Sequence, residues 1–143
     1  MEIIYSKLKP KKILHIVHRA NEFYNNKERH RKDIVDAKEF IQVSALKMKK
    51  GQKFRPHQHI WKDGEKKAIA QESWVVIRGS VKCSFYDIDD TILKEPILNV
   101  GDCSITLAGG HTYSILEDDT LVYEYKTGPY KGSENDKIFI DEN

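Results

Sequence analysis

The chain has 143 residues, which is enough for one domain and too few for two ordinary ones. Its 24 basic and 22 acidic residues nearly cancel to a net charge of +2, so charge gives no reason to expect nucleic acid or a membrane surface as the partner. No apolar run is long enough for a membrane-spanning helix, and a small-molecule ligand is the expected partner.

Residues 1–38 are charged and irregular in composition, and they predict an N-terminal arm with one short strand or helix at most. The three histidines of this segment, His15, His18 and His30, are expected to be solvated and are given no role.

From residue 39 to residue 127 the sequence changes to short apolar runs with turn signals about every ten residues, which is typical of an all-β sandwich or barrel. The expected strands are 40–48, 53–59, 73–77, 81–86, 96–100, 104–107, 112–116 and 121–125. Eight short strands with tight turns predict a jelly-roll barrel.

Both faces of the strand at 73–77 are largely apolar, because Trp74 and Val76 lie on one side and Val75 and Ile77 on the other. Something should therefore cover the outside of the barrel, either the arm or a second subunit, and a homodimer is the expected assembly. The tail at 128–143 is polar apart from residues 138–140, which are expected to form a terminal strand or a dimer contact.

The only two cysteines, Cys83 and Cys103, do not form a close pair, and no apolar leader of the signal-peptide kind opens the chain. Two buried thiols in a reducing cytoplasm are the expected state.

Two histidines end the predicted strand at 53–59. Residues two apart on a strand project from the same face, so the imidazoles of His57 and His59 can reach one metal ion, although a solvated strand face has the same spacing. Glu72 begins the next strand, and His111 opens a later one directly after a Gly-Gly turn. All four residues fall at the same end of predicted strands.

These positions resemble the two motifs of the cupin superfamily over about residues 40–126. The first motif is a Gly, five residues, His-x-His, a spacer, a Glu, six residues and a Gly, which this chain supplies as Gly51, His57, His59, Glu72 and Gly79. The second is a Gly, five residues, Pro-x-Gly, a gap and a His, matched by Gly101, Leu107, Gly109 and His111. The resemblance implies a cupin double-stranded β-helix in which His57, His59, Glu72 and His111 hold one divalent transition metal.

Three imidazoles and a carboxylate suit Fe, Mn, Ni, Co or Zn, and four protein ligands leave open positions on a six-coordinate metal. The chain departs from the family in the long spacer at 60–71, in Leu107 where the family has Pro, and in the short gap before His111. Ile115 also stands where an Asn often follows the second motif. The charged loop at 61–67 is expected to be a lid over bound substrate or a plain solvent-exposed insertion.

Strand alternation from the ligands predicts a cavity lined by one arginine and several aromatic side chains, with core filling as the alternative for each aromatic. The expected lining residues are Arg55, Trp74, Tyr113, Tyr123 and Tyr125. Gln71, beside Glu72, is expected to act behind the ligands rather than as one of them.

The segments 107–111 and 126–130 resemble small bacterial cupins associated with surface-polysaccharide or sugar-nucleotide genes. That resemblance implies an isomerase or epimerase acting on a sugar, in which the metal polarises a carbonyl and a base moves a proton. The sequence identifies no base. An iron-dependent dioxygenase and a non-catalytic, metal-assisted binding module are the alternatives.

Overall fold

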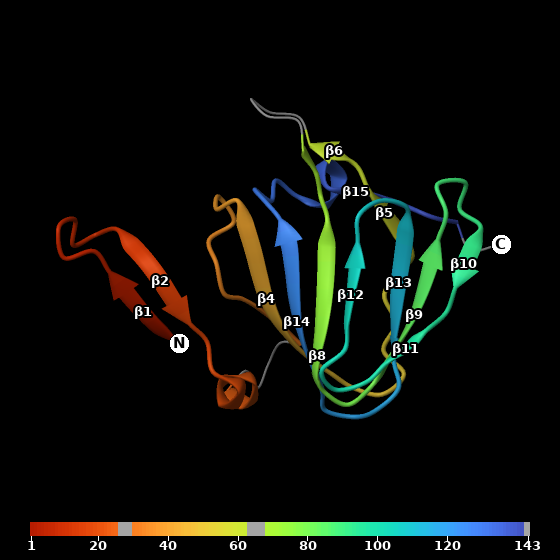
Figure 1. The fold of residues 1–143 in the computed structure, drawn as a ribbon, viewed down its shortest axis with the longest axis horizontal. Helices are drawn as coiled ribbons and strands as arrows, with labels where there is room; N and C mark the ends of the chain where they lie inside the picture. Colours follow the sequence, from red (N-terminus) through yellow and green to blue (C-terminus); the bar gives the residue numbers. More distant parts are fainter. Residues whose placement is uncertain (26–29, 63–67, 142–143) are drawn as a thin grey trace.

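The computed structural model describes residues 1–25, 30–62 and 68–141, and most of its regular elements are β-strands (Figure 1). In chain order they are β1 (Glu2–Tyr5), β2 (Ile13–Val17), the 3₁₀ segment η1 (Ala20–Asn25), β3 (Arg31–Asp33), β4 (Ile41–Met48), β5 (His57–His59), β6 (Trp61–Lys62), β7 (Ala68–Ile69), β8 (Glu72–Arg78), β9 (Val81–Tyr86), β10 (Ile92–Lys94), β11 (Ile97–Leu98), β12 (Cys103–Thr106), β13 (Gly110–Ile115), β14 (Thr120–Thr127), the 3₁₀ segment η2 (Ser133–Asn135) and β15 (Lys137–Phe139).

Two antiparallel sheets form the barrel. The five-stranded sheet has the order β12-β8-β14-β4-β3, and the six-stranded sheet has the order β10-β9-β13-β5-β15, with β11 also paired to β9. Each of the eight predicted apolar runs overlaps one of these strands. The expected all-β jelly-roll architecture is therefore confirmed.

The main core lies between the two sheets and follows from strand alternation. Along β8 the side chains of Trp74 and Val76 are buried, whereas Ser73 and Val75, which alternate with them, are only half-buried. The Trp74 ring stacks on Tyr113 of the opposite sheet, with ring centroids 3.9 Å apart, so aromatic packing joins the two layers. The buried members of this core are Leu46, Met48, Trp74, Val76, Val81, Cys83, Leu98, Tyr113, Ile115 and Val122.

The N-terminal segment covers part of the outer face of the five-stranded sheet. Phe23 of η1 packs there with Ala45 and Leu121, and His18 is buried against Tyr123, with His18 Nδ1 2.9 Å from the Tyr123 hydroxyl. The expectation that something covers this face is met by the arm. The expectation that His18 is solvated is wrong, because its ring fills a gap between the arm and the sheet.

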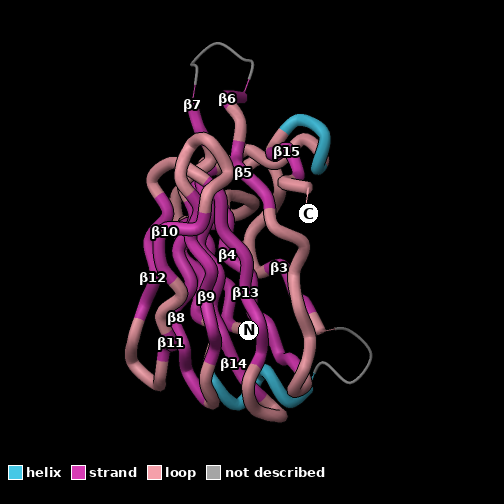
Figure 2. Tube along the Cα trace, turned by 90° about the vertical axis from the view of Figure 1, so that its right-hand side faces the viewer, coloured by secondary structure: helices cyan, strands magenta, loops and turns pink. Residues whose placement is uncertain are grey.

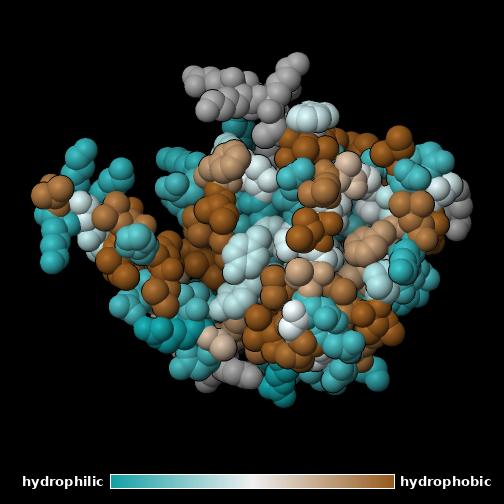
Figure 3. Space-filling view, viewed as in Figure 1, coloured by the Kyte–Doolittle hydropathy of each residue, from teal (hydrophilic) through white to brown (hydrophobic). Residues whose placement is uncertain are grey.

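This segment is more ordered than the sequence indicates. β1 and β2 form a separate two-stranded hairpin that extends away from the barrel (Figure 1), and β3 pairs with β4, so the five-stranded sheet reaches into residues 1–38. Apolar surface covers much of the hairpin and of the barrel edge beside it (Figure 3). Its exposed apolar side chains include Ile3, Ile4, Tyr5, Leu8, Ile13 and Leu14.

The C-terminal tail and the insertion lie at the same end of the barrel. β15, in the segment expected to form a terminal strand, pairs with β5, and the short β6–β7 pair projects beyond them (Figure 2). Residues 63–67 of the expected lid lie outside the described residues.

The two thiols differ in exposure. Cys83 is buried, but Cys103 is exposed on β12, which corrects the expectation of two buried thiols. Among the described residues, no helix has the length and apolar character required to cross a membrane.

Candidate metal centre

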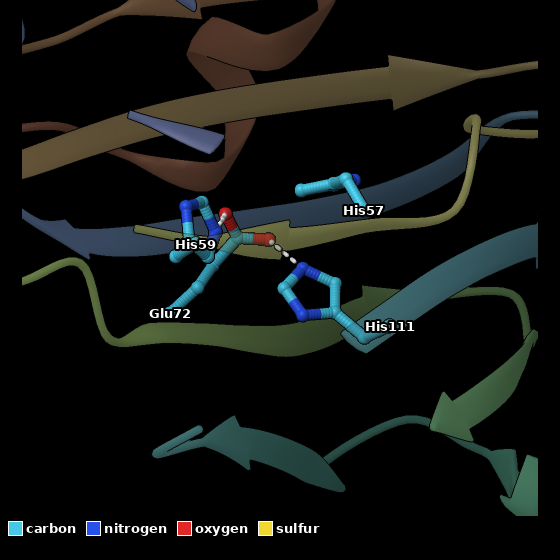
Figure 4. Close-up of side chains that lie close together, drawn as sticks. All are labelled: His57, His59, Glu72 and His111. Atoms are coloured by element: carbon cyan, nitrogen blue, oxygen red, sulfur yellow. Dashed lines mark hydrogen bonds and ion pairs between the residues drawn. The ribbon is translucent and has the colours of Figure 1, made fainter. Parts of the chain in front are cut away.

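The four predicted ligands converge at one end of the barrel. His57 and His59 lie on β5, and His111 of β13 pairs directly with His57 in the antiparallel register. Glu72 is the first residue of β8 in the opposite sheet, and its carboxylate lies between His59 and His111 (Figure 4). All four side chains are buried, and one ligand atom from each lies within 4.8 Å of the others.

Backbone carbonyl groups fix the orientation of two imidazoles. His57 Nδ1–H donates to the Arg55 carbonyl oxygen at 2.9 Å, and His59 Nδ1–H donates to the Asp136 carbonyl oxygen at 3.1 Å. Because Nδ1–H is committed to a carbonyl oxygen in each ring, Nε2 is the nitrogen directed into the cluster, and a metal bound there would take the place of any proton on it. This is the orientation that a metal-binding histidine needs.

Glu72 is the anionic centre of the cluster. Its Oε2 lies 3.1 Å from His59 Nε2, and its Oε1 lies 3.2 Å from His111 Nε2 while accepting a hydrogen bond from Trp74 Nε1–H at 3.0 Å. Burial alone would raise the pKa of Glu72, but the hydrogen bonds from His111 and His59 outweigh it and lower this pKa well below the ordinary value. The carboxylate is therefore ionised at neutral pH.

The pKa values of the two β5 histidines, His57 and His59, are shifted in opposite directions. Burial, the nearby charge of His111 and that of Lys137 lower the pKa of His57 to about 3, so this ring is neutral and able to bind a metal at pH 7. Burial opposes protonation of His59 too, but hydrogen bonds to Asp136 and Glu72 outweigh it and raise the pKa of His59. Without a metal, the cluster thus favours the protonated, positively charged form of His59 beside the carboxylate of Glu72.

The donor set fits a divalent transition metal. Two ligands on opposite sides of a metal with bonds of about 2.1 Å lie about 4.2 Å apart, so the cluster needs to contract only slightly to bind one. His111 Nδ1 is buried with no hydrogen-bond partner among the described residues, so the polar contact of this ring is the one that Nε2 makes with Glu72 inside the cluster.

The turn before β13 places His111. Gly109 has φ +77°, and a Cβ at this position would lie 2.5 Å from the carbonyl oxygen of Tyr86 on β9. Only glycine fits this conformation and this approach without strain. The second motif therefore has a steric basis in this chain despite Leu107 in place of Pro.

A cavity of about 370 Å³ reaches Glu72 from the side of the five-stranded sheet. Glu124 and Lys126 of β14 pair in register with Trp74 and Glu72, so their side chains share the inner face. Arg31 Nη1 lies 2.8 Å from a Glu124 carboxylate oxygen. The walls of this cavity are therefore mostly charged, and Tyr130 is the aromatic residue among them.

The buried carboxyl group of Glu124 has an unusual environment. Its pKa is raised because burial and the negative charge of Glu72 disfavour ionisation, and this effect exceeds the opposing attraction of Arg31 and Lys126. A buried carboxyl group with a raised pKa beside a cavity is a candidate general acid or base.

Two of the five predicted lining residues lie next to the cluster. Trp74 hydrogen-bonds Glu72, and the Tyr113 ring centroid lies 5.3 Å from that of His111, but both rings are core residues under the cluster. The Tyr113 hydroxyl lies 3.0 Å from the Ser104 hydroxyl. These side chains support the cluster, which is the core-filling alternative.

The other three predicted lining residues lie elsewhere. Tyr123 and Tyr125 alternate with Glu124 on β14 and therefore face outward, Tyr123 onto Phe23 and Tyr125 into solvent. Arg55 lies before β5, 4.4 Å above the ring of Phe139, and it lines a separate cavity of about 620 Å³ that contains none of the four predicted ligands.

Several residues around the cluster have roles that the sequence does not predict. Gln71 is exposed, and the residues that act behind the ligands are instead Trp74 and Asp136, the latter buried and 2.8 Å from Lys126 Nζ. Charged residues at alternate positions of 120–127 were an available signal for Glu124 and Lys126. The tail offered no comparable local signal.

Neither models of protein families nor curated proteins match the sequence. Solved structures do. KdgF from Halomonas sp. is 20% identical with a TM-score of 0.54, over 71% of this chain and 80% of that one. A cupin-2 domain containing protein from Shewanella frigidimarina is 16% identical with a TM-score of 0.56, over 78% and 95%.

The capsular polysaccharide assembling protein CapF from Staphylococcus aureus is 16% identical with a TM-score of 0.65, over 82% of this chain and 32% of CapF. The present chain thus spans about a third of the length of CapF. At these identities the likeness is one of fold.

Proposed function

Since the chain has the cupin fold, we propose that it is a metal-dependent isomerase or epimerase acting on a sugar-type or other small metabolite. The observation that carries this proposal is the buried carboxyl group of Glu124, which lines the same cavity as Glu72 of the predicted metal centre. Isomerases and epimerases of carbonyl compounds need a Lewis acid and a proton-transfer group on one substrate, and both lie here.

In this proposal His57, His59, Glu72 and His111 hold one divalent ion, Fe, Mn, Ni, Co or Zn. When bound, such an ion supplies Lewis-acid polarisation of a substrate carbonyl. The protein contributes orientation: the two backbone carbonyl contacts on the β5 imidazoles and the Trp74 hydrogen bond to Glu72 hold three donors in place.

Glu124 is the proposed proton-transfer residue. A carboxylate oxygen of Glu124 takes the proton from the carbon next to the carbonyl and returns it to a neighbouring carbon, or to the opposite face of the same carbon. Arg31 Nη1, 2.8 Å away, fixes the direction of the carboxyl group and limits its rotation. Its raised pKa brings the acid and base forms closer in energy near neutral pH.

Two observations support a sugar-sized substrate. The cavity volume of about 370 Å³ falls in the range of small-molecule sites. The name of CapF associates that protein with capsular polysaccharide, which agrees with the sequence resemblance to cupins of surface-polysaccharide genes. The substrate class is a proposal for this chain.

The test is solvent isotope exchange. Protein loaded with each candidate metal is incubated in D₂O with a panel of keto sugars and sugar nucleotides, and deuterium uptake beside the carbonyl is measured by mass spectrometry. Glu124→Gln should retain metal and lose exchange by about 100-fold or more, whereas the exposed control Glu95→Gln should behave like wild type. Full exchange in Glu124→Gln would refute the proton-transfer role.

The same preparations separate the alternative functions. Oxygen consumption by the iron-loaded protein, without deuterium exchange, would replace the proposal by the dioxygenase alternative. Substrate-induced thermal stabilisation with neither activity would leave a binding module.

We extend the proposal to a cytoplasmic homodimer assembled through the β1–β2 hairpin. An isolated two-stranded hairpin is marginally stable, and this one exposes Ile4 and Leu14 at 40% and 49%. Residues 1–19 carry five basic and one acidic side chain, whereas the rest of the chain has an excess of two acidic ones, so a second copy offers a complementary charge. The free cysteines agree with a reducing compartment.

Sedimentation velocity tests the assembly. Ile4→Ser combined with Leu14→Ser should convert dimer to monomer, whereas Ile88→Ser, on an exposed turn outside the hairpin, should not. A monomeric wild-type protein at micromolar concentration would refute this part of the proposal.

A further inference from the structure

Lys137 points into the predicted metal centre from the C-terminal strand. In the β5–β15 register Lys137 pairs with His59, so its side chain lies on the same face as the His59 ring. It lines the cavity that reaches Glu72, and its Nζ lies 3.1 Å from His57 Nε2. A lysine thus stands beside the cluster although it lies outside both sequence motifs.

The contact of Lys137 with His57 is incompatible with metal binding by the same nitrogen. His57 Nδ1–H donates to the Arg55 carbonyl, so Nε2 has the only free lone pair of the ring, and the Lys137 ammonium group donates to it. A cation bound at Nε2 takes that lone pair and repels the ammonium group. Lys137 must then turn its charge toward the cavity.

The other two cations of the cavity have carboxylate partners. Arg31 pairs with Glu124 at 2.8 Å, and Lys126 pairs with Asp136 at 2.8 Å. Among the described residues, no carboxylate lies within ion-pair distance of Lys137, and its contact is the imidazole of His57. Metal binding therefore leaves one partly buried cation in this wall that lacks a negative partner.

We infer that Lys137 binds the anionic group of the substrate next to the metal, and that within the proposed class of sugar-type or other small metabolites the substrate is one with a carboxylate, such as a 2-hydroxy or 2-keto acid. This inference rests on the proposed metal-dependent function. A carboxylate satisfies both positive charges at once, which a neutral sugar hydroxyl cannot do. Lys137 thus sets substrate charge, while Glu124 remains the proton-transfer group.

The test separates metal binding from anion binding. The metal-free full-length protein is titrated with Co²⁺, whose visible absorption reports occupancy, and the cobalt-loaded protein is then titrated with lactate and with its neutral analogue lactamide. Wild type should prefer lactate. Lys137→Met should lose that preference by about 10-fold or more, should bind Co²⁺ at least as tightly as wild type, and should retain its fold by circular dichroism.

Two further variants complete the design. Lys137→Arg keeps a positive charge and should retain much of the lactate preference, whereas the matched control Lys53→Met, in the separate 620 Å³ cavity, should leave both titrations unchanged. An equal lactate preference in wild type and Lys137→Met overturns the role of Lys137 and leaves the metal proposal intact. Absence of Co²⁺ binding by wild type overturns the metal proposal and this inference with it.

Discussion

Acid is expected to destabilise the metal-free protein through His57. The pKa of this ring falls from 6.5 to about 3 on folding, because burial, the charge of His111 and that of Lys137 disfavour the imidazolium form. The unfolded chain therefore binds a proton at pH values where the folded chain does not. The stabilising effect of a neutral His57 is fully present above pH 6.5 and is lost as the pH falls toward 3.

The magnitude follows from proton linkage. Between about pH 7.5 and about pH 4.5 the unfolded state gains nearly a full proton at this site, which lowers the free energy of unfolding by about 2.5 kcal/mol. His57→Asn removes the titrating ring and should flatten the pH dependence by this amount. Urea unfolding of chelator-treated protein is followed by circular dichroism at several pH values. It gives the dependence of the free energy of unfolding on pH for wild type and for His57→Asn.

The matched control is His15→Asn, which removes an imidazole exposed on the hairpin and should keep the wild-type slope. The difference between variants is the informative quantity, because His59 has a raised pKa and acts in the opposite direction in both proteins. Parallel pH profiles for wild type and His57→Asn would refute the reasoning, since His57 would then not be held neutral by its surroundings.

Three further outcomes are expected. Trp74→Phe removes the indole donor to Glu72 and should weaken metal binding by about 10-fold or more, as measured by competition with a chelator; unchanged affinity would contradict the role of this hydrogen bond. Gly109→Ala places a Cβ 2.5 Å from a carbonyl oxygen at positive φ and should cost about 1–3 kcal/mol of stability, with a matching fall in Tm; an unaltered melting curve would argue against the close approach. In the native protein Cys103 should react quickly with a thiol reagent, whereas Cys83, whose pKa burial raises to about 12, should react only after denaturation, and two fast thiols would contradict its burial.

The predicted ligands were accessible from sequence because each lies at a strand end next to a turn. His57 and His59 share a face by alternation, and Gly109 marks the turn that brings His111 beside them. Which side chains of β14 face the inside of the barrel could not be predicted in the same way. Four of the five residues at 121–125 are apolar or aromatic, because the arm covers the outer face while the core covers the inner one. Because both faces of β14 are apolar, its sequence does not show the alternation of apolar and polar residues that marks an inner face. The prediction that Tyr123 lines the cavity is therefore wrong.

The contributions of the termini were beyond local sequence rules. The pairing of Lys137 with His59 joins segments that lie far apart in the chain. No pattern within 128–143 indicates with which strand this segment pairs. Arg31 likewise enters the cavity through β3, in a segment whose composition resembles a solvated arm. Charged residues in these positions look like surface until the strand pairing is known.

The division of the four predicted ligands between the two layers has a mechanical consequence. His57, His59 and His111 belong to the six-stranded sheet, whereas Glu72 belongs to the five-stranded one. An ion bound by all four residues would link the two sheets at the open end of the barrel. Its release would require the layers to part, so the off-rate of the ion should report how often the sheets separate at this end.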